Sequence, residues 1–394
     1  MRSTVIVRLL LSVPLLFMSS LLLASSSWDM TPGVTDISSQ VFHLHRIILY
    51  VCIAIGLGVF GMMFWSILHH RKSKGAVAAH FHESTVVEII WTIIPFIILI
   101  GMAIPATRVL VAMNDTSDSN MTVRITGSQW KWNYEYLTYE DDKQVGVSFF
   151  SVLSTPREQY ERQGKGFGAS NTPDFKAHPN YLLEVDKPLV IPSGQKVRFL
   201  LTADDVIHAW WVPDFALKRD AVPGFVNEIW VDVPVGKEGI YRGRCAELCG
   251  KDHAFMPIVV EVKSKADFKK WLADAKVRSE AEAKAAAASV DYKFPSLDAA
   301  MKDGEAVYVA RCAACHQVSG AGLPPMFPAL KGSKIATEKA HLQDHIDIII
   351  NGKNAMPGWK AILTPREMAA VTTYERNAWG NATGDLVQPS EFAK

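Results

Sequence analysis

One stretch of the chain concentrates sulfur and imidazole side chains at short spacing. It contains, in order, Cys245, Cys249, His253 and Met256. A further histidine, His208, follows two acidic residues and precedes two tryptophans. Thiolate, imidazole and thioether ligands together favour copper over hard cations. Because two thiolates in one loop can bridge a pair of metal ions, we expect a copper site that holds two ions.

The same cysteine pair admits two other interpretations. Cysteines four apart in an exported chain can form a small disulfide. Cys245, Cys249, His208 and His253 could also hold zinc. Met256 argues against both, because zinc sites take no thioether ligand and a disulfide would leave the histidines and the methionine without a role.

A second constellation lies in the C-terminal third, where Cys312-Ala-Ala-Cys315-His316 has the Cys-x-x-Cys-His spacing of c-type haem attachment. In such a motif the two thiols bond to the haem vinyl groups and the histidine, here His316, becomes an axial iron ligand. A thioredoxin-like interpretation fails, because no strand-helix-strand pattern surrounds the motif and His316 would stay unexplained.

The sixth iron ligand should follow later in the chain. The segment Asn354-Ala-Met356-Pro-Gly-Trp359 resembles the methionine loop of class I cytochromes c, so we expect Met356. Met326, flanked by prolines, is the alternative. Histidine and methionine ligation raises the iron potential. His341 and His345, four apart on an expected helix, are predicted to lie at the surface.

The length and net charge of the chain limit the number of folded units and the kind of partner. A chain of 394 residues should hold two or three folded units. With 41 basic and 40 acidic residues its formal charge is +1, which gives no reason to expect a nucleic acid partner.

The N-terminal part indicates export and a membrane anchor. Residues 1–26 have signal-peptide order, with Arg2 and Arg8 before an apolar run and small residues after it, although a third membrane helix is an alternative. Residues 47–68 and 89–107 are uncharged and near span length, so residues 27–112 should form a transmembrane hairpin. The basic loop between the two spans places that loop in the cytoplasm, and everything after Arg108 outside.

The remainder divides into a β-rich domain at 113–262, a helix and linker at 263–290, and a helical domain at 291–394. Strands are expected at 123–126, 181–185 and 197–202, in a sandwich. Trp130, Trp132, Tyr134 and Tyr136 alternate and should share one face of a strand. Ser264 is expected to cap the helix that follows it, and Thr364-Pro365-Arg366-Glu367 predicts a capping box at the start of a later helix. Residues 277–290, rich in Ala, Glu and Lys, predict a semi-rigid helical spacer.

With these motifs in place, residues 30–262 resemble subunit II of bacterial haem-copper cytochrome c oxidase, and the whole chain resembles the form with a fused cytochrome c. The resemblance implies a cupredoxin-like domain in which His208, Cys245, Cys249, His253 and Met256 bind dinuclear copper (CuA). It also implies that the backbone carbonyl of Glu247 binds copper and its side chain a magnesium ion shared with subunit I.

The resemblance further implies two transfer sites. Trp130 would receive electrons from cytochrome c, and Glu88 would stand at the mouth of a cytoplasmic proton path. The implied function is electron transfer from the fused haem, or from a soluble or membrane-bound cytochrome c, through copper to subunit I, with both domains on the periplasmic side of the bacterial inner membrane. A nitrous or nitric oxide reductase component and a non-enzymatic carrier are the alternatives.

Overall fold

The computed structural model describes residues 29–77, 80, 82–155, 179–324, 327–354, 356–360 and 362–393. The predicted signal peptide and Met326 lie outside these ranges. The chain divides into a helical unit that ends at Asp115 and includes Pro213–Ala216, and a second unit that holds the rest.

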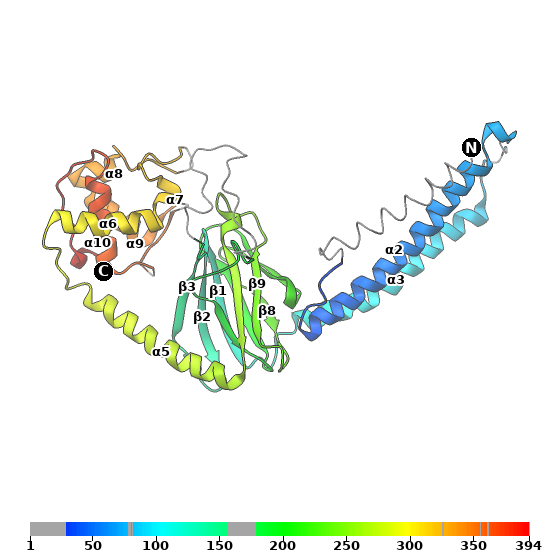
Figure 1. Cartoon of the computed structure of the whole chain (residues 1–394), viewed down its shortest axis with the longest axis horizontal. Coiled ribbons are helices and arrows are strands. Elements are labelled where there is room, and N and C mark those ends of the chain that lie inside the picture. The colour runs from blue at the N-terminus through cyan, green and yellow to red at the C-terminus, as the bar shows by residue number, and fades with distance from the viewer. Residues whose placement is uncertain are drawn as a thin grey trace, which may run out of the picture. The chain divides into compact units, whose positions relative to one another are not determined.

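Two long helices form the first unit. They are α2 (Asp36–His69) and α3 (Thr85–Asn114), which lie side by side in Figure 1, with the short helix η1 (Lys72–Lys74) in the connection between them. Thr35 and Ser38 form a capping box that fixes the start of α2. Both long helices are apolar and long enough to cross a membrane, and their apolar side chains are exposed. The predicted hairpin is confirmed, and each helix extends beyond the predicted span.

A sandwich of two five-stranded sheets forms the first part of the second unit. One sheet has the order β3 (Val147–Ser151), β2 (Lys131–Tyr139), β1 (Met121–Ser128), β5 (Val197–Ala203), β8 (Asn227–Val231). The other has the order β4 (Leu189–Pro192), β10 (Pro257–Lys263), β9 (Gly239–Cys245), β6 (His208–Val212), β7 (Leu217–Ala221). The short helix η2 (Pro213–Phe215) follows β6. Strands β1 and β5 run parallel, as do β4 and β10, and the other pairs are antiparallel.

The sandwich core explains the aromatic alternation and corrects two predictions. Trp132, Tyr134 and Tyr136 point inward from β2 and are buried, as expected for side chains with a period of two. Trp130 does not join them, because it lies in the turn between β1 and β2 and is half-buried. The strand predicted at 181–185 is also wrong. That segment forms a turn followed by an isolated bridge between Val185 and Leu153.

Helix α5 (Lys265–Ala288) follows β10 directly and packs on the sandwich. Ser264 is the N-cap, as predicted, because its side chain accepts a hydrogen bond from the amide of Asp267. Phe268 is buried with its ring centroid 5.0 Å from that of Tyr139, and Trp271 lies 5.3 Å from Tyr136. The predicted helix and the predicted helical spacer are therefore one continuous helix.

The last part of the chain is helical. Its elements are α6 (Leu297–Arg311), α7 (Ala313–His316), α8 (Lys334–Thr337), η4 (Lys339–His341), α9 (Leu342–Asn351), the small pair β11 (Gly352–Lys353) and β12 (Met356–Pro357), α10 (Pro365–Asn377) and η5 (Pro389–Phe392). Helices α6 and α10 pack closely at Gly304, where an added Cβ would lie 2.1 Å from the carbonyl oxygen of Ala370. Thr364 and Glu367 form the predicted capping box of α10.

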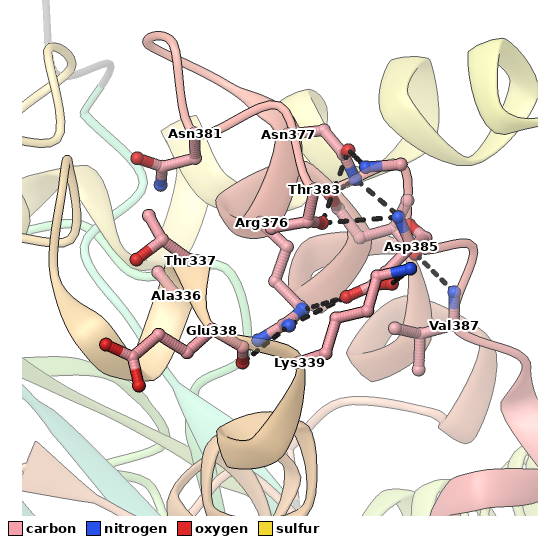
Figure 2. A network of polar contacts seen from close by, with 12 residues as sticks. Ala336, Thr337, Glu338, Lys339, Arg376, Asn377, Asn381, Thr383, Asp385 and Val387 are labelled. Atoms are coloured by element: carbon pink, nitrogen blue, oxygen red, sulfur yellow. Dashed lines mark hydrogen bonds and ion pairs between the residues drawn. The ribbon is translucent and has the colours of Figure 1, made fainter.

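A buried arginine ties the end of α10 to two surrounding segments. The guanidinium of Arg376 is fully buried and donates to Asp385 at 2.7 and 2.9 Å, as Figure 2 shows. It also donates to the carbonyl oxygens of Ile335 and Glu338 at 2.9 and 3.0 Å. Because four donor contacts compensate the buried charge, this pair holds α8 and the C-terminal segment onto α10.

Candidate metal and cofactor sites

The sulfur and nitrogen atoms singled out in the sequence meet at one end of the sandwich. Cys245 ends β9, and Cys249 follows in the loop that leads to η3 (His253–Phe255). Their Sγ atoms lie 3.9 Å apart and both side chains are buried. Nδ1 of His208 lies 3.9 Å from Sγ of Cys245, and Nδ1 of His253 lies 3.4 Å from Sγ of Cys249.

The thioether completes this group on the Cys249 side. Sδ of Met256 lies 3.4 Å from Sγ of Cys249, and the Met256 side chain is buried. Sγ of Cys245 lies 3.3 Å from the carbonyl oxygen of Glu247. Each sulfur thus has one imidazole and one weaker donor beside it, which is the donor chemistry that a pair of copper ions requires.

The fold holds the His208 ring in place from two sides. His208 begins β6 and is fully buried against Gly127 of β1, where an added Cβ would lie 2.9 Å from the ring. On the other side, Nε2 lies 2.9 Å from Oδ1 of Asp205. Asp205 is itself buried and accepts the amide of Gln129 at 2.7 Å. The ring therefore keeps Nδ1 directed at Cys245, since Nε2 is engaged by the carboxylate.

The pKa of each thiol in this group depends on the neighbouring thiol. A hydrogen bond from Cys249 and the contact with His208 lower the pKa of the Cys245 thiol to about 3, although burial opposes this shift. The pKa of Cys249 is raised, because its proton is shared with Cys245 and because the thiol is buried. One thiolate is therefore stabilised before any metal binds, and thiolate is the form that coordinates metal ions.

The haem motif lies at the junction of α6 and α7. Cys312 and His316 are buried and Cys315 is half-buried. Nδ1 of His316 lies 2.9 Å from the carbonyl oxygen of Pro328, which leaves Nε2 for an axial bond and orients the ring, as partners of metal-bound histidines do. In the C-terminal part of the chain, Cys312, Cys315, His316 and Met356 line one cavity. These residues fit a covalently attached haem.

Comparisons with known proteins agree with this geometry. The family described as cytochrome c oxidase subunit II, periplasmic domain, matches residues 121–263, and its transmembrane domain matches residues 24–109. The family described as cytochrome c oxidase, cbb3-type, subunit III, matches residues 299–374. A probable cytochrome c oxidase subunit 2 of Rickettsia prowazekii is 37% identical over 249 residues, which cover 63% of this chain and 72% of the relative. The chain belongs to the cytochrome c oxidase subunit II family.

Further proteins are similar to parts of this chain. Cytochrome c oxidase subunit 2 of Arabidopsis thaliana is 34% identical over 66% of this chain and 94% of its own length. The crystal structure of the periplasmic domain of subunit II of cytochrome oxidase (CoxB) of Bradyrhizobium japonicum is 34% identical, with a TM-score of 0.32 over 41% of this chain and 98% of that chain.

As a subunit II protein with a cytochrome c domain at its C-terminal end, the chain is a membrane protein and an electron-transfer subunit of cytochrome c oxidase. Copper and haem are the cofactors of its two soluble domains. The predicted fold class is confirmed, with a helical hairpin, a cupredoxin-like sandwich and a helical cytochrome domain. The reductase component and the non-enzymatic carrier are not favoured.

The remaining predicted positions of this subunit II protein lie as follows. The indole nitrogen of Trp130 donates to the carbonyl oxygen of Cys249 at 3.3 Å, so Trp130 is in direct contact with the loop between β9 and η3. Glu247 is exposed at the loop surface. Glu88 lies in the first turn of α3 and is exposed.

One histidine was predicted wrongly. His345 is not at the surface, because its side chain is 3% exposed and Nε2 lies 2.8 Å from Oε2 of Glu375, which is also buried. The apolar residues Ile346, Ile349 and Ile350 mark the buried face of α9, and His345 stands on that face. The spacing of His345 and Ile349, four apart, could have indicated its burial. Glu375 is a buried acidic residue that the sequence analysis missed.

Proposed function

We propose that this subunit binds dinuclear copper and a covalent haem c through side chains that the structure brings together. The proposed copper ligands are His208, Cys245, Cys249, His253, Met256 and the carbonyl oxygen of Glu247. The proposed haem residues are Cys312, Cys315, His316 and Met356. Copper and haem bound at these positions supply one-electron redox chemistry.

The observation that carries the copper proposal is the arrangement around the two thiols. Cys245 has His208 and the Glu247 carbonyl beside it, while Cys249 has His253 and Met256. A zinc site would not use the buried thioether. A blue-copper site would not use both cysteines. Two half-sites that share a pair of sulfurs, each with one imidazole and one weaker donor, fit two copper ions.

The chain's own residues prepare these sites for electron transfer. Asp205 fixes the His208 ring, and the Pro328 carbonyl fixes His316. Burial of Cys245, Cys249 and Met256 keeps bulk water away from the copper ligands. A site with fixed, dry ligands changes little between its oxidation states, which favours rapid outer-sphere transfer.

We infer the wider context from the family. The proposed partners are oxidase subunit I and the other oxidase subunits, with a soluble or membrane-bound cytochrome c as donor. The chain then passes electrons from its own haem, and from that donor at Trp130, to subunit I for reduction of oxygen to water. Glu247 would bind magnesium at the subunit I boundary, and Glu88 would open a cytoplasmic proton path.

The proposed location and domain limits follow the same context. The hairpin at 27–112 anchors the chain in the bacterial inner membrane after removal of a signal peptide at 1–26. The CuA domain at 113–262, the helix and linker at 263–290 and the cytochrome domain at 291–394 then face the periplasm. The basic residues Arg71, Lys72 and Lys74 between α2 and α3 support this orientation.

Metal analysis of the full chain in detergent tests the proposal. We expect two copper ions and one covalent haem, and Cys249→Ser should remove the mixed-valence copper spectrum while the haem spectrum stays. Cys52→Ser is the matched control, because Cys52 is a free cysteine in α2, far along the sequence from either ligand set. A copper to iron ratio near one, or bound zinc, would refute the dinuclear assignment.

A further inference from the structure

Two buried ionisable side chains join α9 to α10 and take no part in the proposed haem ligation. Nε2 of His345 lies 2.8 Å from Oε2 of Glu375, and the two side chains are 3% and 5% exposed. Their neighbours on α9 and α10 are mostly apolar, among them Ile346, Ile349 and Val371. A well-packed apolar pair of similar volume would stabilise such a core at least as well as a buried ionic pair. Packing alone therefore does not account for this pair.

The pair faces the haem cavity. His345 and Glu375 line the same cavity as Cys312, Cys315, His316 and Met356. Burial, followed by the negative charge of Glu375, raises the pKa of the Cys312 thiol, so the carboxylate acts electrostatically on the haem attachment motif. Nδ1 of His345 is buried and has no hydrogen-bond partner within the described part of the chain.

The unpartnered nitrogen indicates the charge that the pair carries. A protonated imidazole would leave a charged N–H group buried without an acceptor, which costs more than leaving a lone pair unused. The neutral tautomer donates Nε2–H to the Glu375 carboxylate and leaves Nδ1 as a bare acceptor. The pair then carries one negative charge, held on Glu375.

Neither of the two arginines closest to Glu375 in the sequence or on α6 cancels this charge. Arg376, the next residue, is turned away from the cavity and is paired with Asp385, as Figure 2 shows. Tyr308 faces the pair from α6, and Glu375 contributes with burial to a raised pKa of this tyrosine, which stays neutral. Arg311, also on α6, lines the cavity but is exposed to solvent, where its charge is screened.

We propose that Glu375, oriented by His345, is a fixed negative charge in the haem cavity wall that lowers the reduction potential of the haem. This inference rests on the proposed attachment of haem at Cys312 and Cys315. Ferric haem carries one more positive charge than ferrous haem, so a nearby carboxylate stabilises the ferric form. Burial and second-shell groups are established means by which proteins set haem potentials. Glu375 touches no iron ligand. It acts on the haem through its charge, and His345 orients its carboxylate.

Redox titration of the haem in the purified full chain tests the proposal. Glu375→Gln keeps an acceptor for His345 and removes only the charge, so it should raise the midpoint potential. We expect a change of roughly tenfold in the electron-transfer equilibrium constant, by Coulomb's law at an effective dielectric constant of about 20. For one electron, tenfold equals about 59 mV. Glu375→Asp keeps the charge and should restore most of the parent potential.

Asp385→Asn is the matched control for a general loss of structure. It breaks the ion pair between Asp385 and the buried Arg376 in the same domain, and neither residue lines the cavity. This variant should lower the melting temperature and leave the potential unchanged. The proposal is overturned if Glu375→Gln leaves the potential at the parent value, or if both variants change it equally.

Haem incorporation separates this inference from the proposed function. Covalent haem is measured first, in the parent and in every variant. Parent protein without covalent haem would refute the proposed attachment itself. Parent and variant proteins that both carry haem, with equal potentials, would refute only the role of Glu375.

Discussion

Nε2 of His208 lies 2.9 Å from Oδ1 of Asp205, while Nδ1 of the same ring lies 3.9 Å from Sγ of Cys245. One imidazole thus connects a buried carboxylate to the proposed copper ligands. Burial opposes ionisation of Asp205, but the hydrogen bonds from His208 and two backbone amides lower its pKa. The carboxylate can therefore hold the tautomer of His208 in which Nδ1 is free for a metal ion.

Asp205→Asn should weaken copper binding by about 10- to 100-fold, because groups that orient metal ligands typically contribute that much. Competition with a copper chelator measures the change. Asp204→Asn is the matched control, since Asp204 is the exposed neighbour and its carboxylate accepts a hydrogen bond from Ser128. Equal copper affinity in the two variants would show that Asp205 does not orient the ligand.

Met356→His should convert the haem from histidine-methionine to bis-histidine ligation and lower its potential, because the thioether favours reduced iron. Absorption spectroscopy of the ferric protein follows the band of methionine-ligated haem. If this band survives in Met356→His and disappears in Met326→His, the sixth ligand is Met326.

A chain that ends at Val290 should keep the copper site and lose the fused donor. The cut leaves α5 intact, including its contacts with the sandwich. Such an oxidase should accept electrons from added cytochrome c at high concentration, but its rate at low donor concentration should fall, because an intramolecular step becomes bimolecular. Steady-state oxidation at several donor concentrations measures this. An unchanged concentration dependence would place the fused haem off the main electron route.

Trp130→Ala extends the same measurement. If one route serves both donors, this change slows electron arrival from added cytochrome c and from the fused haem alike. Slower arrival from the added donor alone would show two separate routes to copper. Tyr136→Phe is a suitable comparison, because Tyr136 is buried in the sandwich core, where its ring packs on Trp271 of α5.

Acid should loosen α5 from the sandwich. Hydrogen bonds from Lys265 and Lys269 lower the pKa of Glu140 to about 2, from 4.5. A lowered folded-state pKa means that the contribution is complete above the unfolded value and is lost as pH falls through the folded one. Hydrogen exchange of α5 amides should therefore differ between the parent and Glu140→Gln near neutral pH and converge near pH 2. A difference that persists in acid would assign the anchoring to other contacts.

The sequence predicted most of the architecture because its signals are local. Uncharged runs mark the two membrane helices, and the capping residues Ser264 and Thr364 mark helix starts that the structure reproduces. The prediction of a strand at 181–185 was wrong, because this segment pairs through one isolated bridge rather than a ladder. Trp130 continues the alternation of Trp132 in the sequence, yet the chain turns before β2 begins.

The candidate sites divide in the same way. Motif spacing, together with the resemblance to known families, identified the cysteines, histidines and methionines that the structure gathers around Cys245 and in the haem cavity. The groups that support them were not predicted. Asp205 and Pro328 act through contacts that depend on how strands and loops meet, and the partner of His345 lies 30 residues away on another helix.

The packing of α5 on the sandwich limits how the cytochrome domain can move. Ion pairs with the sandwich continue along the helix as far as Glu282, which lies 3.6 Å from Lys187. At the other end, Arg366 of α10 covers the ring of Tyr292 at 4.2 Å, so the cytochrome domain already includes this residue. Between Glu282 and Tyr292 the chain stays in α5 as far as Ala288, and only residues 289–291, which span about 10 Å when extended, lie outside the helix. We expect the cytochrome domain to reorient about residues 289–291 more readily than it changes its distance from the end of α5.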